Sequence, residues 1–233
     1  MTQSTHSLFL HAAPGAQAER TLPSPAPAPV AAPAPVALPA AMERQLDQLC
    51  HSLRVGHDHG PRVIQVVGLR AEDGASSVCR GLASHAASRL GVRTLLLEVD
   101  PPGPGRGELA SLGSPPVLDA GDPAAALEDA RASHAPLLLA RLWNLDGDDG
   151  HRPATVPMRV QEMLTLREVM GLIVIDSNQS ALSPECALIG RLADGVVLAV
   201  EPSRTPMDLA VQVRNQMVGC GARVLGVVLN HTV

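Results

Sequence analysis

Six short aliphatic segments recur along this 233-residue chain, and they constrain its fold more than any other feature. The segments are residues 62–68, 94–99, 136–142, 171–176, 195–201 and 223–230. Nearly all are continuous apolar runs rather than alternations of apolar and polar residues. Because a strand buried on both faces has no solvent side, continuous runs are typical of parallel sheets covered by helices. The sequence therefore predicts a largely parallel sheet.

Helical patterns lie between these segments. Residues 41–53 place Met42, Leu46, Leu49 and Leu53 at helical spacing, which predicts a lead-in helix with one packed stripe. Further helices are expected at residues 76–90, 124–132, 158–170, 184–192 and 206–220. Repeated alternation of strand and helix predicts an α/β fold, with a doubly wound, mostly parallel sheet and helices on both faces.

The N-terminal part has a different composition. Residues 23–39 alternate Pro and Ala with Val and Leu, which favours extended, hydrated backbone over a packed core. We predict a disordered Pro/Ala-rich arm over residues 1–40 and one domain over residues 41–233. The arm is interpreted as a linker or tether, and an unconstrained tail is favoured over a Pro-rich docking motif.

Composition narrows the function. The net charge of −5 gives no basic surface for a phosphate backbone, so nucleic acid is not expected as a partner. We find no signal peptide and no apolar run of about 20 residues, which favours a cytoplasmic protein. The cysteines are isolated and are expected to be reduced thiols packed as small apolar groups: Cys50, Cys79, Cys186 and Cys220.

A glycine-containing loop joins the first predicted strand to the next helix, in the sequence context of a phosphate-binding loop. It runs from Gly68 to Ser77, and Ala75 stands where such loops carry their lysine. No lysine occurs anywhere in the chain, so no other segment can supply one. Since that lysine contacts the β- and γ-phosphates, nucleotide chemistry is doubtful at this loop.

Acidic residues follow several of the predicted strands. Glu98 and Asp100, Asp176 and Glu201 lie at strand ends, where open parallel sheets bind their ligands. A loop hydroxyl of Ser76 or Ser77 with Asp176 could hold magnesium. The alternative is that these carboxylates cap helices or face solvent.

Several motifs together resemble a known family. The loop 71–77 follows the strand that ends at Gly68, residues 95–100 match an acidic strand-end motif, and residues 172–176 match a Walker B strand. The most specific match is late, at residues 192–200, 204–206 and 221–230. From about Glu43 onwards the chain resembles the cytosolic domain of bacterial tyrosine kinases that accompany polysaccharide co-polymerases. That family lies within the partitioning and septum-site ATPases, a P-loop superfamily.

The resemblance implies a site for ATP or ADP with magnesium. It implies nucleotide contacts from one set of residues: Arg70, Asp73, Gly74, Ala75, Ser76, Ser77 and Asn230. It implies magnesium ligands at Ser76, Asp100 and Asp176, and catalytic roles for Glu98, Asp100 and Asp176 if the protein is active. It also implies a membrane co-polymerase as the partner, bound at its cytosolic face and so at the inner membrane face. A homo-oligomer is left open.

Departures from the family pattern weaken the catalytic reading. Ala75 replaces the loop lysine, Glu98 replaces an aspartate, and the clustered tyrosines of the kinase tail are missing. Leu46 and Leu49 stand where the family's ring-forming helix carries arginines. Arg70 could bind phosphate in place of lysine, although exposure to solvent or pairing with a nearby carboxylate is favoured.

These observations favour a catalytically degenerate, kinase-like accessory protein of exopolysaccharide or capsule synthesis and export that works by binding. The alternatives are an active ATPase or protein kinase that uses arginine in place of lysine, and a partitioning-type positioning ATPase.

Overall fold

The computed structural model describes residues 40–58, 60, 62–70, 72–100, 115–142, 155–177 and 181–230. The predicted arm lies almost wholly outside the described residues, so the division of the chain at residue 40 stays a prediction. Trp143, the only tryptophan, also lies outside them.

Seven strands form one sheet in the order β3-β4-β2-β5-β1-β6-β7, and every neighbouring pair is parallel. The strands are β1 (Val63–Gly68), β2 (Thr94–Glu98), β3 (Val117–Leu118), β4 (Leu137–Arg141), β5 (Leu172–Ser177), β6 (Gly195–Val200) and β7 (Val224–Leu229). The predicted α/β fold is confirmed, and the described sheet is wholly rather than mostly parallel.

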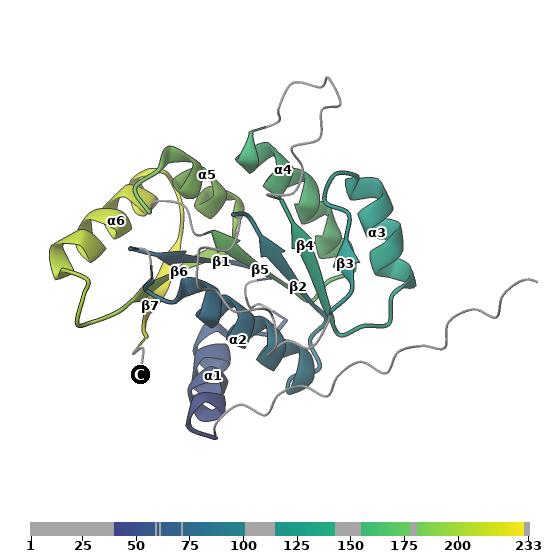
Figure 1. Cartoon of the computed structure of the whole chain (residues 1–233), viewed down its shortest axis with the longest axis horizontal. Helices are drawn as coiled ribbons and strands as arrows, with labels where there is room; N and C mark the ends of the chain where they lie inside the picture. Colours follow the sequence, from purple (N-terminus) through teal and green to yellow (C-terminus); the bar gives the residue numbers. More distant parts are fainter. Residues whose placement is uncertain are drawn as a thin grey trace, which may run out of the picture. The chain divides into compact units, whose positions relative to one another are not determined.

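Helices cover both faces of this sheet (Figure 1). One face packs against α1 (Ala40–Leu53) and α2 (Ala75–Ser88). The other packs against α3 (Pro123–Ala132), α4 (Val156–Met163), the 3₁₀ helix η2 (Leu164–Glu168), α5 (Pro184–Leu192) and α6 (Met207–Gly219). This is the doubly wound arrangement that the alternating sequence pattern predicts.

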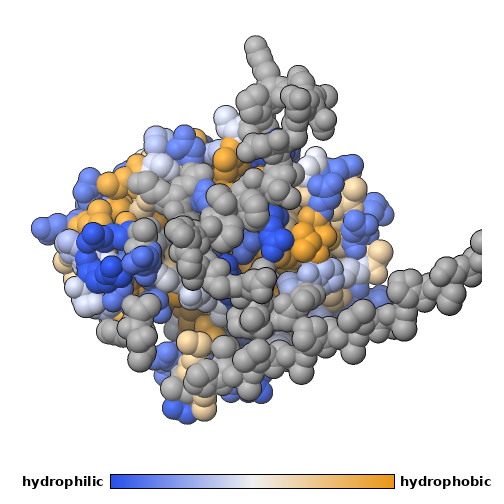
Figure 2. All heavy atoms as spheres, viewed as in Figure 1, coloured by the Kyte–Doolittle hydropathy of each residue, from blue (hydrophilic) through white to orange (hydrophobic). Residues whose placement is uncertain are grey.

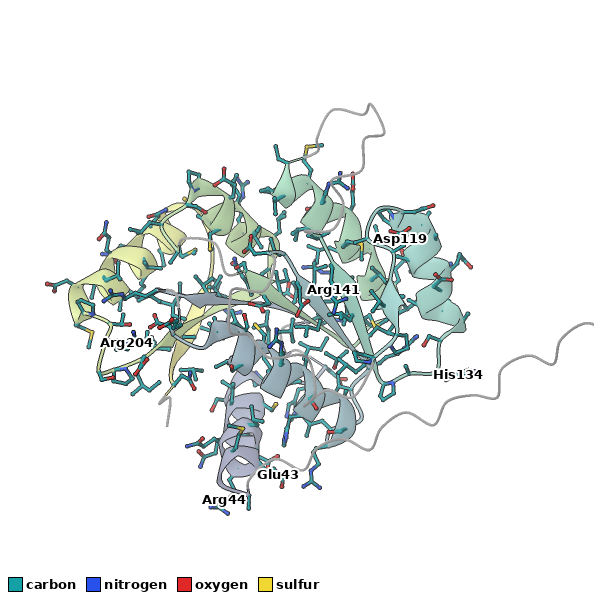
Figure 3. The ribbon with its side chains drawn as sticks, in the orientation of Figure 1. Glu43, Arg44, Asp119, His134, Arg141 and Arg204 are labelled. Atoms are coloured by element: carbon teal, nitrogen blue, oxygen red, sulfur yellow. The ribbon has the colours of Figure 1, made fainter. Side chains whose placement is uncertain are left out.

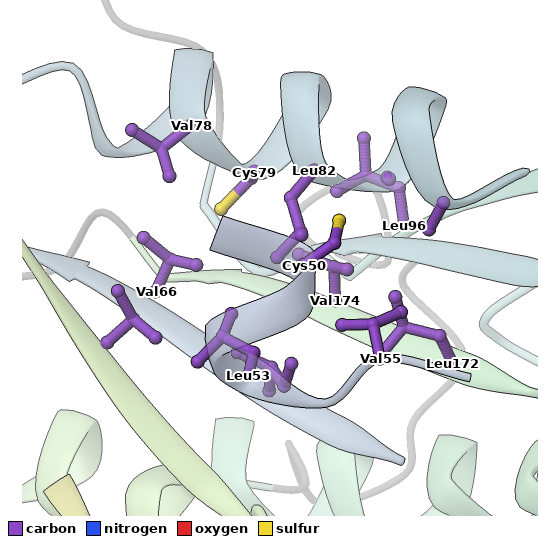
Figure 4. Close-up of a cluster of buried hydrophobic side chains, with 14 of the residues drawn as sticks. Cys50, Leu53, Val55, Val66, Val78, Cys79, Leu82, Leu96, Leu172 and Val174 are labelled. Carbon is purple, nitrogen blue, oxygen red and sulfur yellow. The ribbon is translucent and has the colours of Figure 1, made fainter. Parts of the chain in front are cut away.

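The continuous aliphatic runs are buried as expected. Every residue of β1, β2, β5 and β6 is buried. Figure 4 shows the cluster beneath α1 and α2, where Leu82 of α2 and Val66 of β1 lie among Leu96 and Val174. Aliphatic side chains fill both layers, and among the described residues no buried member of the core is Phe, Tyr or Trp.

The lead-in helix packs as predicted, except at its start. Leu46 and Leu53 are buried against α2 and the sheet, whereas Met42 is 47% exposed. Polar contacts also fix this helix, since Asp47 Oδ1 lies 2.6 Å from His85 Nε2 and Glu43 accepts a hydrogen bond from Arg89. Contacts along the helix, from Glu43 to Leu53, therefore anchor it to α2 and the sheet.

Three details differ from the sequence-based predictions. Strand β3 was not predicted, because two residues carry no periodic pattern. The helix expected at residues 158–170 breaks into α4 and η2 after Met163. Cys50, Cys79 and Cys186 are buried free thiols as expected, but Cys220 is exposed at the C-terminal end of α6.

Candidate functional site

The loop between β1 and α2 keeps the backbone shape of a phosphate-binding loop. Gly74 precedes α2 with φ 78° and ψ 18°, a left-handed conformation that favours glycine. At Gly68, a Cβ would lie 3.2 Å from the Cβ of Ala75, so glycine permits close packing where the loop begins. The lack of a side chain at both glycines thus lets the loop pack closely against the start of α2.

Asp73 is the centre of the hydrogen bonds inside this loop. Its carboxylate is 2% exposed; Oδ2 accepts the backbone N–H of Arg70 at 2.8 Å, and Oδ1 accepts the hydroxyl of Thr205 at 2.8 Å. The backbone N–H of Glu201 is a longer donor to Oδ1, at 3.4 Å. The carboxylate that resemblance assigned to nucleotide contact is thus satisfied by the protein itself.

Arginines tie the same loop to the segment between β6 and α6. Arg70 is exposed, and its Nη1 donates to the carbonyl oxygen of Arg204 at 2.7 Å rather than to a carboxylate. Arg204, labelled in Figure 3, pairs with Glu72 at 2.9 Å and lies 3.7 Å from Glu201. The Glu72 carboxylate raises the pKa of Arg204 further above its ordinary value.

Asn230 meets this loop from the end of β7. Its side-chain Nδ2 donates to the carbonyl oxygen of Asp73 at 3.2 Å, and its backbone N–H donates to the carbonyl of Val200 at 2.8 Å. A Cβ on Gly74 would overlap the Asn230 amide. The structure therefore brings Asp73, Gly74 and Asn230 together, and their part in nucleotide binding stays a prediction.

The first turn of α2 has no cation at the lysine position. Ala75 and Ser76 are 4% and 5% exposed, and Ser77 is exposed. Because Gly74 caps the helix without a side chain, the first amides of α2 point beyond its end as they do in anion-binding loops. The backbone part of the cradle is present and its charged part is missing.

The acidic strand ends converge as the parallel register requires. Glu98 of β2 lies beside Asp176 of β5 on one side and beside Arg141 of β4 on the other. Glu98 is 5% exposed, and its carboxylate lies 3.4 Å from Arg80 Nη2 and 3.2 Å from Arg141 Nε. Figure 3 shows Arg141 at this end of β4. Two guanidinium groups therefore hold Glu98.

This arrangement differs from that of a conventional magnesium–triphosphate site at two positions, Glu98 and Ala75. Glu98 is engaged by cations, and two guanidinium groups already supply the formal charge of one divalent ion. Within the part of the chain that the structure describes, no three His, Cys, Asp or Glu side chains form a metal-binding group. With Ala75 in the lysine position, the usual positive charges around a triphosphate are not present in their usual places. Ser76, Asp100 and Asp176 as magnesium ligands stay a prediction.

A buried thiol lies beside the Walker B strand. Burial raises the pKa of Cys79 well above its usual value, and the charge of Asp176 raises it further. The Cys79 thiol lies 3.9 Å from the carbonyl oxygen of Ile175. At neutral pH this sulfur is a protonated, apolar packing group and not a nucleophile.

Three partners in the site were not found from the sequence. Arg80 and Arg141 belong to no motif, and Thr205 lies in the matched segment 204–206 but was given no role there. The three lie 18, 43 and 132 residues from the carboxylates that they contact. Only the strand order could have indicated one of them, since it puts β4 next to β2 and so Arg141 beside Glu98.

No protein-family model and no curated protein matches this sequence. Solved structures do match its fold. The kinase domain of the Escherichia coli tyrosine kinase ETK aligns with a TM-score of 0.59 and 15% identity, over 82% of this chain and 75% of that chain. The VpsO kinase domain aligns with a TM-score of 0.57 and 17% identity, over 83% of this chain and 97% of that one.

The BceF tyrosine kinase domain is similar, with a TM-score of 0.55 and 18% identity over 82% of this chain and 76% of that chain. At these identities the likeness establishes the fold. The chain therefore has the P-loop NTPase-like α/β fold that is also seen in bacterial tyrosine kinase domains. No helix in the described ranges is both long and apolar enough to cross a membrane.

Proposed function

We propose that this protein is a catalytically degenerate, kinase-like accessory factor of exopolysaccharide or capsule synthesis and export. It acts by binding the cytosolic face of a membrane polysaccharide co-polymerase. The observation that carries the proposal is Ala75, a buried methyl group at the position where a phosphate-binding loop needs a cation. Phosphoryl transfer depends almost wholly on positioning and electrostatic stabilisation, so this loss removes orders of magnitude in rate.

The contacts around the loop support a binding role. Asp73 and Glu98 are held by residues of the protein, where an active site would leave them for ligand or metal. The loop keeps its shape through Thr205, Arg204 and Asn230. A loop that is held by the protein's own side chains suits a protein that presents a surface to a partner.

Nucleotide binding tests the degenerate site. Titration of the full chain with a fluorescent ATP analogue and magnesium should show weak or no binding. Ala75→Lys should restore measurable affinity if the backbone cradle is intact, and Ala75→Met is the matched control because it adds a long side chain without charge. Micromolar affinity with ATP turnover by the unaltered protein would refute the proposal.

The active-enzyme alternative rests on Arg70, whose guanidinium is exposed beside the loop. Its Nη1 donates to a carbonyl, so it would have to leave Arg204 to reach a phosphate. The genetic test uses Asp176→Ala. If polysaccharide output is unaffected by this change but abolished by removal of the protein, the enzyme alternative is wrong. A partitioning-type role would instead require nucleotide-dependent dimerisation, which sedimentation with and without ATP measures.

A further inference from the structure

A groove lies between α1 and strands β6 and β7. It has a cavity volume of about 390 Å³. Its walls come from the C-terminal end of α1 and from strands β6 and β7: Leu49, Ser52, Leu53, Arg54, Val197, Arg223, Leu225, Gly226, Val227 and Val228. We call this the α1–β7 groove. Most of its lining is aliphatic.

The β7 side of the groove is the open edge of the sheet. Among the described strands β7 pairs only with β6, so its other edge offers backbone N–H and C=O groups without a strand partner. Val227 is 52% exposed and Leu229 is 61% exposed. β7 contains no charge and no proline, although soluble proteins usually protect such edges with one or the other.

The charge at the groove is uniformly positive. Arg54 and Arg223 both line it, both are exposed, and neither forms an ion pair with a described residue. No carboxylate is among the lining residues. Because the lining carries two arginines and no carboxylate, charge complementarity favours an acidic occupant. Figure 2 shows that apolar side chains (orange) lie interspersed with hydrophilic ones (blue) on the face in view.

We propose that the α1–β7 groove binds an extended aliphatic segment of a partner protein, flanked by carboxylates. The segment adds to the edge of β7 by backbone hydrogen bonds, its apolar side chains enter the groove, and its carboxylates pair with Arg54 and Arg223. This inference rests on the proposed function only in taking the segment to belong to the partner of this protein. The recognition chemistry is independent of nucleotide.

A pair of peptides tests the proposal on the full chain. The probe has a Val-Thr-Val-Thr-Val core with a Glu at each end, and its matched control has the same core with a Lys at each end. Calorimetric titration should detect binding of the Glu peptide, and the Lys peptide should bind at least about tenfold more weakly. This difference in affinity should fall as the salt concentration rises. Equal binding of both peptides, or binding of neither, would overturn the proposal.

Two variants locate the binding. The double change Arg54→Glu and Arg223→Glu should reverse the preference between the two peptides. Gly226→Leu should abolish binding of both by filling the groove, and it is expected to fold because no atom lies within 4 Å of a Cβ at this position. If Gly226→Leu instead dissolves a dimer seen by sedimentation, a second copy occupies the groove and the proposal is wrong. Failure here leaves the ATP test above unaffected, so the two proposals fail separately.

Discussion

The charged side chains of two regions, the β1–α2 loop with its neighbouring strand ends and the α1–β7 groove, differ in burial and in bonding. At the loop, Asp73 and Glu98 are buried and bonded to residues from distant segments. At the groove, Arg54 and Arg223 are exposed and form no ion pair with a described residue. The comparison contrasts a loop whose carboxylates are bonded within the protein with a groove whose arginines face solvent.

Removal of the Asp73 carboxylate is the strongest test of the loop. Asp73→Ala should lower the free energy of unfolding by about 3 kcal/mol, because the part-buried N–H of Arg70 and the buried hydroxyl of Thr205 both lose their acceptor. Urea denaturation measures the change. Asp129→Ala, at an exposed position on α3, is the control and should cost no more than about 0.5 kcal/mol. A loss at Asp73 no larger than the control would mean that the loop is not held by this residue.

The arginine-held carboxylate gives the next largest effect. Glu98→Gln should lower the free energy of unfolding by about 2 kcal/mol, because it leaves two partly buried guanidinium groups without their shared counter-charge. The matched change Glu128→Gln breaks an exposed pair with Arg131 and should cost about 0.5 kcal/mol or less. Equal costs for the two changes would show that the arginine pairs at Glu98 contribute no more than an exposed pair, and the comparison would fail.

The sequence predicted the sheet and its helices well, because continuous aliphatic runs and helical periodicity are local signals. It also identified Asp73, Gly74 and Asn230 as residues of one site, and they do meet. It could not predict the cations that hold Glu98, because Arg80 and Arg141 reach it only through strand order and helix placement. It likewise gave no sign of the α1–β7 groove, which residues far apart in the chain create.

Alkaline pH distinguishes a buried thiol on α5 from an exposed thiol at the end of α6. The pKa of Cys186, buried beside Ser177, is raised to about 11 from its usual 9.0, chiefly by burial. As pH rises, the thiol therefore ionises first in the unfolded protein. The stability that the buried, protonated thiol contributes is fully present below pH 9 and is lost as pH rises toward 11. At pH 10 the loss from this thiol should be about 1.4 kcal/mol.

The measurement is the slope of unfolding free energy between pH 8.5 and pH 10.5. Cys186→Ala should flatten this slope, whereas the same change at the exposed Cys220 should leave it as it is. Equal slopes for the unaltered protein and Cys186→Ala would show that the thiol is accessible to water in the native state.

One substitution made in both regions gives the smallest and most direct contrast. Arg80→Met and Arg223→Met remove the same charge and keep a similar stem. Arg80→Met should cost about 1 kcal/mol, because Glu98 then depends on Arg141 alone in a site that is 5% exposed. Arg223→Met should change the free energy of unfolding by at most about 0.5 kcal/mol, since no described carboxylate pairs with it. It should nevertheless weaken binding of the Glu peptide. Similar stability costs at the two positions would contradict the distinction between an arginine that the fold requires, Arg80, and one that serves only ligand binding, Arg223.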